Sequence, residues 1–185
     1  MTAPHIHITG ASGAGVTTLG RALAKRLGAV HLDTDDFYWS PAEPRYSVRR
    51  SVDERLRLLR DAFVATGSRG WILSGAVSEW ADPIANLFDL VVFVTAPTEV
   101  RLKRLRERER VRFGDAVLPG GSRHREHEAF IEWAAAYESG TCEGRSLPRH
   151  EVWLAERRCP VLRLDGTLPV EALAEAAVAA LNREP

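Results

Sequence analysis

The sequence predicts an α/β protein in which a parallel sheet lies between two layers of helices. Two observations carry this prediction. Five short β-rich apolar segments alternate with segments of helical periodicity, and a glycine-rich turn joins the first strand to the first helix. Strands that alternate with helices pair in parallel through right-handed crossovers, which gives a three-layer α/β/α sandwich with its ligand site at the carboxyl ends of the strands.

Each element has a local signal. The first strand alternates polar and apolar residues, and Leu19, Leu23 and Leu27 form one stripe of the helix that follows. Ser51 and Glu54 make a capping box, and Asp82 before Pro83 is typical of a helix start. We further expect Thr98 and Thr167 to cap helices. The expected strands are 5–9, 29–32, 71–75, 90–94 and 160–164, and the expected main helices are 17–27, one after 51, 98–112, 123–138, 147–157 and one after 167.

Composition excludes several classes of protein. The 185 residues suit one domain spanning 1–185, and 45% hydrophobic residues suffice for a core. Lys and Arg (25) balance Asp and Glu (25), so the net charge of zero argues against a nucleic-acid binder. No apolar run approaches the roughly 20 residues of a membrane span, and the two cysteines have no metal-site spacing. We therefore expect a soluble, cytoplasmic protein, either a monomer or a homodimer, without membrane or nucleic-acid partners.

The glycine-rich turn has the spacing GxxxxG-x-[ST] of a phosphate-binding loop. In such a loop, small residues let backbone N–H groups converge on phosphate oxygens at a helix N-terminus, and a threonine hydroxyl can bind Mg²⁺. We assign the metal role to Thr17, and the alternative is a merely flexible turn. Valine stands at position 16, where the motif has lysine. The expected nucleotide-binding residues are Gly10, Ala11, Ser12, Gly13, Ala14, Gly15, Val16, Thr17 and Thr18.

A basic helix is the second candidate for binding phosphate. Residues 101–112 hold seven positive and two negative side chains, a net charge of 7 − 2 = +5. Arg101, Arg104 and Arg108 lie three and four residues apart, on one helical face. With the glycine-rich segment 113–122, this helix predicts a lid over about 101–125 whose arginines replace the missing lysine. The alternative is a solvated basic helix.

Taken together, several segments resemble the small P-loop kinases of the shikimate-kinase and nucleoside-monophosphate-kinase type. The resemblance covers nearly the whole chain and implies a five-stranded parallel sheet of order 2-3-1-4-5, with ATP and Mg²⁺ as cofactors. The segments that carry it are GASGAGVTT at 10–18, LDTDDFYW at 32–39, WILSG at 71–75, FDLVVFVTAP at 88–97, the arginine-rich 101–112 and VLRLDGTLP at 161–169.

The resemblance implies roles for the acidic cluster that follows the second strand. Asp33 would belong to the metal shell and Asp35 would be the base that orients the acceptor hydroxyl, with Asp36 as the alternative base. The other interpretation of these residues is an acidic turn or a helix cap. Asp165 and Gly166 match the loop that borders adenine in the family.

Acceptor-binding residues are implied less directly. The candidates are Gly75, Ser78 and one of Arg45, Arg49 and Arg50, together with an aromatic wall of Tyr38, Trp39 and Trp80. Trp133, on the helix after the lid, either joins this wall or lies in the core, and the core is the simpler expectation. His124 and His127 are expected on the surface rather than at a metal.

The main hypothesis is therefore phosphoryl transfer from Mg-ATP to a small molecule, most simply a nucleoside monophosphate or a nucleoside. The alternative is a non-catalytic ATP-binding switch or sensor that lost transfer chemistry with the lysine.

Overall fold

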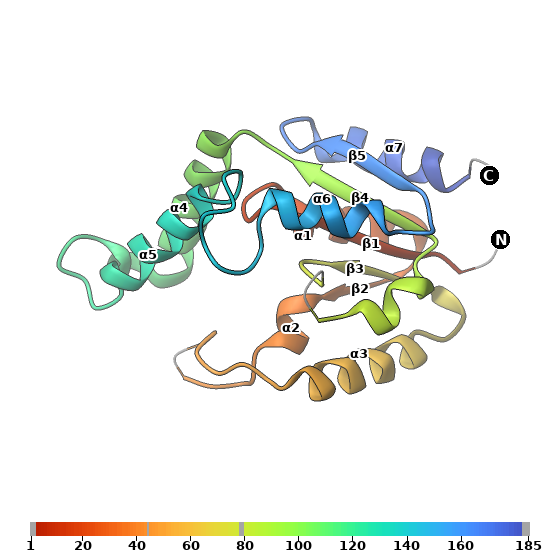
Figure 1. Ribbon diagram of the computed structural model, residues 1–185, viewed down its shortest axis with the longest axis horizontal. Helices are drawn as coiled ribbons and strands as arrows, with labels where there is room; N and C mark the ends of the chain where they lie inside the picture. The colour runs from red at the N-terminus through yellow and green to blue at the C-terminus, as the bar shows by residue number, and fades with distance from the viewer. Residues whose placement is uncertain (1–2, 44, 78–79, 183–185) are drawn as a thin grey trace.

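A computed structural model describes residues 3–43, 45–77 and 80–182, and it contains the expected sheet (Figure 1). Five parallel strands are ordered β2-β3-β1-β4-β5, as the resemblance implies. Their bounds are β1 His5–Gly10, β2 Val30–Asp33, β3 Trp71–Ser74, β4 Leu90–Thr95 and β5 Val161–Asp165.

Helices cover both faces of the sheet and form two apolar layers. On one face, α1 (Val16–Leu27) and α7 (Val170–Leu181) pack over strand side chains such as Ile8 and Val92. On the other face, α3 (Val52–Thr66) and α6 (Leu147–Ala155) pack over Leu73 and Phe93. Parallel strands buried on both faces are apolar throughout, which explains why Leu90–Thr95 has no polar alternation.

A projection extends beyond the carboxyl ends of the strands. It consists of α4 (Thr98–Phe113), a short turn η3 (Gly114–Val117) and α5 (His124–Ala135). Leu105, Ile131 and Ala134 give these helices a small apolar core of their own. The projection, which we call the arm, therefore extends past the predicted lid of 101–125.

The smaller elements complete the rim of the sheet. They are α2 (Thr34–Tyr38) after β2, and two 3₁₀ turns, η1 (Gly67–Arg69) and η2 (Asp82–Leu87). Within the described ranges, none of the helices has the length and apolar character needed to cross a lipid bilayer.

The helix caps match the sequence prediction only in part. Ser51 accepts a hydrogen bond from the Glu54 amide, as the capping box predicts. The predictions for Thr98, Thr167 and Asp82 were wrong, because α4, α7 and η2 begin after Pro97, Pro169 and Ala81. The Thr98 hydroxyl instead donates to Glu138, and the Thr167 hydroxyl to Asp165.

Candidate active site

One large cavity of about 1390 Å³ opens at the carboxyl ends of β1, β2 and β3. Its walls come from the glycine-rich turn, from α2 and the segment after it, from the arm, and from the segment between α5 and α6. This is the position that the topology of a parallel α/β sheet predicts for a ligand.

The glycine-rich turn forms the first wall. Gly13 and Gly15 have φ angles of 85° and 105°, which side-chain-bearing residues adopt only with strain. A Cβ atom on Gly13 would also lie 2.6 Å from the Arg101 carbonyl oxygen. Among the described side chains, none caps the N-terminus of α1, and its first turn has no acidic residue. The helix therefore presents free amides and a partial positive charge to an anion.

Val16 supplies no charge to this wall. Its side chain packs against the apolar cluster under α1 and α7, although the residue also borders the cavity. Any positive charge above the turn must therefore come from other elements.

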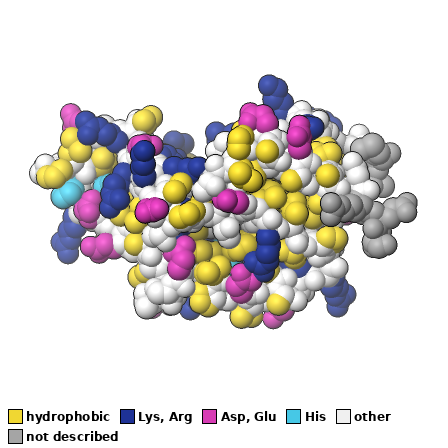
Figure 2. Space-filling model, turned by 90° about the horizontal axis from the view of Figure 1, so that it is seen from above, with side chains coloured by type: hydrophobic (Ala, Val, Ile, Leu, Met, Phe, Trp, Pro, Cys, Tyr) yellow, Lys and Arg dark blue, Asp and Glu magenta, His cyan; other side chains and the backbone are white. Residues whose placement is uncertain are grey.

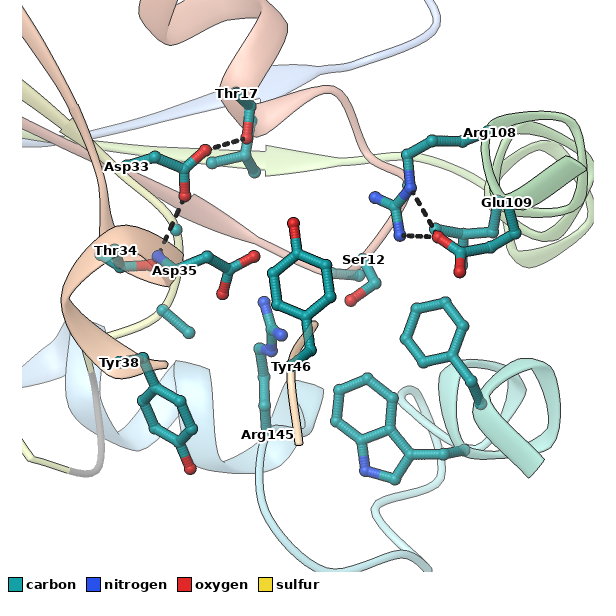
Figure 3. Close-up of a pocket in the computed structure, with 18 of the residues that line it drawn as sticks. Ser12, Thr17, Asp33, Thr34, Asp35, Tyr38, Tyr46, Arg108, Glu109 and Arg145 are labelled. Atoms are coloured by element: carbon teal, nitrogen blue, oxygen red, sulfur yellow. Dashed lines mark hydrogen bonds and ion pairs between the residues drawn. The ribbon is translucent and has the colours of Figure 1, made fainter. Parts of the chain in front are cut away.

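Thr17 and Asp33 lie together at the floor of the cavity (Figure 3). The Thr17 hydroxyl donates to Asp33 Oδ2 over 3.1 Å, and Asp33 Oδ1 accepts from the Asp35 amide over 3.1 Å. Asp33 thus caps α2, as the alternative interpretation held, and still directs its second oxygen toward the glycine-rich turn. A hydroxyl and a carboxylate oxygen at this spacing are suitable partners for Mg²⁺ that keeps several waters.

Asp35 projects from the first turn of α2 into the cavity. Its side chain is exposed to the cavity, and the cavity walls surround it. Desolvation, and then the neighbouring Asp33 carboxylate, raise the pKa of Asp35, while Arg145 and Arg108 oppose the shift. A carboxylate with a raised pKa is a better proton acceptor than an ordinary one. Asp36 lies beside it and also borders the cavity.

Aromatic and cationic side chains form the wall next to α2. Tyr38, Trp39, Arg49 and Trp80 all border the cavity, and Trp39 and Arg49 form an isolated antiparallel bridge. Gly75 borders it too, and a Cβ atom there would lie 1.8 Å from the Thr34 hydroxyl, so the position has no room for a side chain. Ser78 lies outside the described residues.

The three arginines considered for the acceptor have different positions. Arg49 faces the cavity, whereas Arg50 donates to the carbonyl groups of Asp36 and Phe37 at the end of α2. Arg45 is not among the residues that border the cavity.

Arg55 is a residue that the sequence analysis missed. It lies on α3 with 7% of its surface exposed, and its guanidinium carbon is 3.7 Å from the centre of the Tyr38 ring. The guanidinium therefore supports the aromatic wall from behind. Its position in the first turns of α3 was visible, but a single arginine in an amphipathic helix is no distinctive signal.

The arm supplies positive charge from the opposite side. Figure 2 shows Lys and Arg side chains gathered over it, with acidic side chains between them. Arg104 donates to the carbonyl oxygens of Gly13 and Gly166, and Arg108 pairs with Glu109 at 3.1 Å. Both arginines border the cavity, and their contact with a triphosphate stays a prediction.

Arg101 corrects the sequence analysis. It was expected on the lid, facing a triphosphate, but its side chain is fully buried and pairs with Glu138 at 2.6 Å. The three-and-four spacing does place Arg101 on the same helical face as Arg104. However, the first turn of α4, which is the root of the arm, packs against the glycine-rich turn, and this contact buries Arg101.

Asp165 and Gly166 were expected to border adenine, and that role stays a prediction. Neither borders the large cavity. Asp165 accepts from the amide and hydroxyl of Thr167, and it borders a smaller cavity of about 530 Å³ behind the turn. Gly166 packs so closely on the Ala14 carbonyl that a Cβ atom would lie 2.2 Å away.

The segment between α5 and α6 contributes the residue that sequence reasoning missed most clearly. Arg145 extends into the middle of the cavity near Asp35 (Figure 3), and its guanidinium carbon lies 5.5 Å from the centre of the Trp133 ring. The sequence feature that could have indicated Arg145 is its position just after Gly140 and Gly144, which mark a second glycine-containing loop.

Two more corrections concern the same wall. Trp133 borders the cavity and donates to the Glu143 carbonyl, so it is not simply a core residue. His127 is buried beside the cavity rather than on the surface. Over the described ranges, no three His, Cys, Asp or Glu side chains form a metal-binding group.

The fold and the glycine-rich turn define a P-loop protein with a kinase-like α/β architecture. A family model described as "AAA domain" matches residues 6–118, and the chain belongs to that family. It is also 47% identical to the uncharacterized protein YqaC of Bacillus subtilis strain 168, over 87% of this chain and 88% of YqaC.

Solved structures share the fold at lower identity. A sugar kinase from Janibacter sp. HTCC2649 is 21% identical with a TM-score of 0.54, covering 97% of this chain and 95% of that one. A shikimate kinase from Bacteroides thetaiotaomicron is 21% identical with a TM-score of 0.54, covering 97% and 99%. TT1252 from Thermus thermophilus is 20% identical with a TM-score of 0.57, covering 100% of both chains. At these identities the likeness shows the fold.

Proposed function

We propose that this protein transfers a phosphoryl group from Mg-ATP to a small-molecule acceptor, most simply a nucleoside monophosphate or a nucleoside. The observation that carries the proposal is that the phosphate-type turn and the Asp33–Asp35 pair border one cavity, where Thr17 is hydrogen-bonded to Asp33. The kinase folds of the similar structures support the same reaction class.

The nucleotide side would use backbone groups. Amides of residues 11–15 and the N-terminus of α1 would hold phosphate oxygens, and Arg104 and Arg108 would approach from the arm. Mg²⁺, where bound by Thr17 and Asp33 with its remaining positions filled by water and phosphate, would neutralise charge on the phosphates.

The acceptor side would use side chains. Asp35 would orient an acceptor hydroxyl and take its proton while the hydroxyl oxygen forms a bond to the terminal phosphorus. The bond from phosphorus to the bridging oxygen then breaks, and ADP leaves with that electron pair. A phosphate acceptor has no proton to lose, so Asp35 would only orient it.

The acceptor's chemistry follows from its wall. Tyr38, Trp39 and Trp80 suit a flat ring, and Arg49 and Arg145 suit an anionic group beside it. Aromatic and guanidinium groups together fit a nucleoside monophosphate better than an uncharged nucleoside.

The arm would act as a lid. It carries its own small core and meets the body of the molecule at the ends of α4 and α5, so it can move as a unit. Closure would exclude water that otherwise hydrolyses ATP.

The test incubates the protein with Mg-ATP and a pool of nucleosides, nucleoside monophosphates and hydroxylated metabolites, and reads ADP and new phosphorylated masses by mass spectrometry. Asp35→Asn is the control. A phosphorylated mass that appears only with the unmodified protein supports the proposal and identifies the acceptor.

A second candidate function is a nucleotide-binding switch, favoured by Val16 and by the Arg108–Glu109 pair, which engages one arm arginine. ATP that raises the melting temperature without any product from the pool would favour this second function.

A further inference from the structure

The root of the arm lies directly behind the phosphate-type turn. The Cβ position of Gly13 is 2.6 Å from the carbonyl oxygen and 3.0 Å from the Cα atom of Arg101, so the two backbones are in contact. Arg101 itself is fully buried, in a chain where charged side chains otherwise lie mostly at the surface. A buried guanidinium requires hydrogen-bond partners, and their identity indicates what it does.

The guanidinium contacts four segments. Nη1 donates to the Ser12 carbonyl of the turn over 3.2 Å and to the Ala134 carbonyl of α5 over 3.2 Å. Nη2 donates to both carboxylate oxygens of Glu138, over 2.6 and 2.7 Å, and Nε donates to the Ala96 carbonyl over 3.2 Å. One side chain thus joins the turn, the residue after β4, the last turn of α5 and the segment that follows α5.

The Ser12 carbonyl is the functionally important partner. A turn that binds phosphate must direct its amides inward and its carbonyls outward, because carbonyl oxygens repel an anion. Ala14 donates to the Ala11 carbonyl within the turn, and Arg101 holds the Ser12 carbonyl toward the buried root of the arm. The side chain of Val16 has no hydrogen-bond donor for these carbonyl groups. The donor to the Ser12 carbonyl is Arg101, which lies on α4.

We propose that Arg101 is a positioning residue that holds the phosphate-type turn in its binding conformation, and that its pairing with Glu138 links this conformation to the seating of the arm. The part that concerns the turn needs no nucleotide. The part that concerns affinity rests on the function proposed above.

Hydrogen–deuterium exchange of the nucleotide-free protein tests the first part. The variants are Arg101→Lys, which keeps the charge but not the planar fork, and Glu138→Gln, which removes the charge of the partly exposed partner but keeps its size and one acceptor oxygen. The control is Arg163→Lys, because Arg163 and Glu151 form another doubly bonded pair remote from the turn.

We expect amides 11–15 to exchange about tenfold faster in Arg101→Lys, and less so in Glu138→Gln. In the control variant, Arg163→Lys, the exchange of these amides should be unchanged, even if its melting temperature falls as much as that of Arg101→Lys. Unchanged exchange in both variants, or an equal increase in the control, would overturn the proposal.

Titration calorimetry with Mg-ATP tests the second part. We expect Kd to rise about tenfold in Arg101→Lys with the control unchanged. An unmodified protein that does not bind Mg-ATP would refute the proposed function and leave the exchange result standing. An unmodified protein that binds, with variants that bind equally well, would refute the coupling alone.

Discussion

The two sides of the cavity are built from different materials. The side proposed to bind nucleotide consists of backbone: a tight turn between β1 and α1, with Gly13 and Gly15 in conformations that few residues adopt. The side proposed to bind the acceptor consists of side chains, such as Tyr38, Arg49 and Arg145, from segments distant in sequence. Under the proposed function, backbone amides would hold any phosphate, whereas single substitutions could change the choice of acceptor.

The largest effect should come from the carboxylate between the two sides. With a hydroxyl acceptor, Asp35→Asn should lower kcat by about 10²- to 10³-fold, because an amide cannot accept the acceptor's proton. With a phosphate acceptor, which has no proton to lose, the loss of kcat should be smaller. Affinity for Mg-ATP should remain close to that of the unmodified protein. Steady-state kinetics with the identified acceptor measure the first quantity, and calorimetry the second.

The matched control is Asp53→Asn, which removes an exposed carboxylate on α3 outside the cavity. Because burial and Asp33 raise the pKa of Asp35, the acid limb of the rate profile should lie at higher pH than for an ordinary carboxyl group. Full activity of the Asn variant would remove Asp35 from the mechanism.

The next effect concerns the charge that Val16 does not provide. Arg108→Gln should lower kcat by about 10²-fold, because Arg108 would stabilise charge on the transferring phosphoryl group. Arg110→Gln removes an equal charge from the same helix outside the cavity, and it should change kcat little. Equal losses in both variants would indicate a general effect of helix charge.

A smaller effect should distinguish the acceptor side. Arg145→Gln should raise the acceptor's KM about tenfold, through a lost charge-assisted hydrogen bond, and leave the KM for ATP unchanged. Arg149→Gln is the comparison, since Arg149 also borders the cavity but lies in the first turn of α6. A rise in the ATP KM for Arg145→Gln would place this residue on the nucleotide side.

The last effect is on stability rather than on activity, and it concerns β1, which leads into the turn. Burial lowers the pKa of His7 to about 3, so the native protein holds this ring neutral while the unfolded chain protonates it near 6.5. The stability this gives is complete above pH 6.5 and is lost as the pH falls toward 3. For this one group, the free energy of unfolding should fall by about 3 kcal/mol between pH 6.5 and pH 4.

Urea unfolding across this pH range measures the effect. His7→Phe should flatten the pH dependence, since the ring already stacks on Phe88 at 4.9 Å and Phe does not titrate. An unchanged slope would mean that other groups, such as His150 with its pKa lowered by burial to about 4, dominate the acid response.

Much of the fold was predictable because it depends on local patterns. Alternation of strands and helices, the capping box at Ser51 and the apolar run of β4 each persist in the structure, and the resemblance supplied the strand order. The wrong helix starts at Thr98 and Thr167 had a common cause. Pro97, just before Thr98, and Pro169, two residues after Thr167, are the N-cap residues instead. The two threonine hydroxyls donate to nearby carboxylates.

The candidate site divides in the same way. Residues of the glycine-rich turn and Asp33, Asp35 and Asp36 could be named because each follows a strand directly, so its place at the carboxyl edge of the sheet is known from the chain alone. Arg55 and Arg145 could not, because a lone arginine carries no periodic signal. Only the packing of its segment brings Arg145 into the cavity and Arg55 against the ring of Tyr38.

The sequence by itself determined the sheet, the turn and the acidic cluster, because backbone geometry and hydrophobic periodicity depend on residues that are close together in the chain. Only the tertiary structure decided the fate of the arginines on α4. Arg101, Arg104 and Arg108 share one helical face, yet the first is buried against Ser12 and Glu138 while the others border the cavity. The reason is that the burial of a helix face depends on what packs against each of its turns, and spacing along the chain does not contain that information.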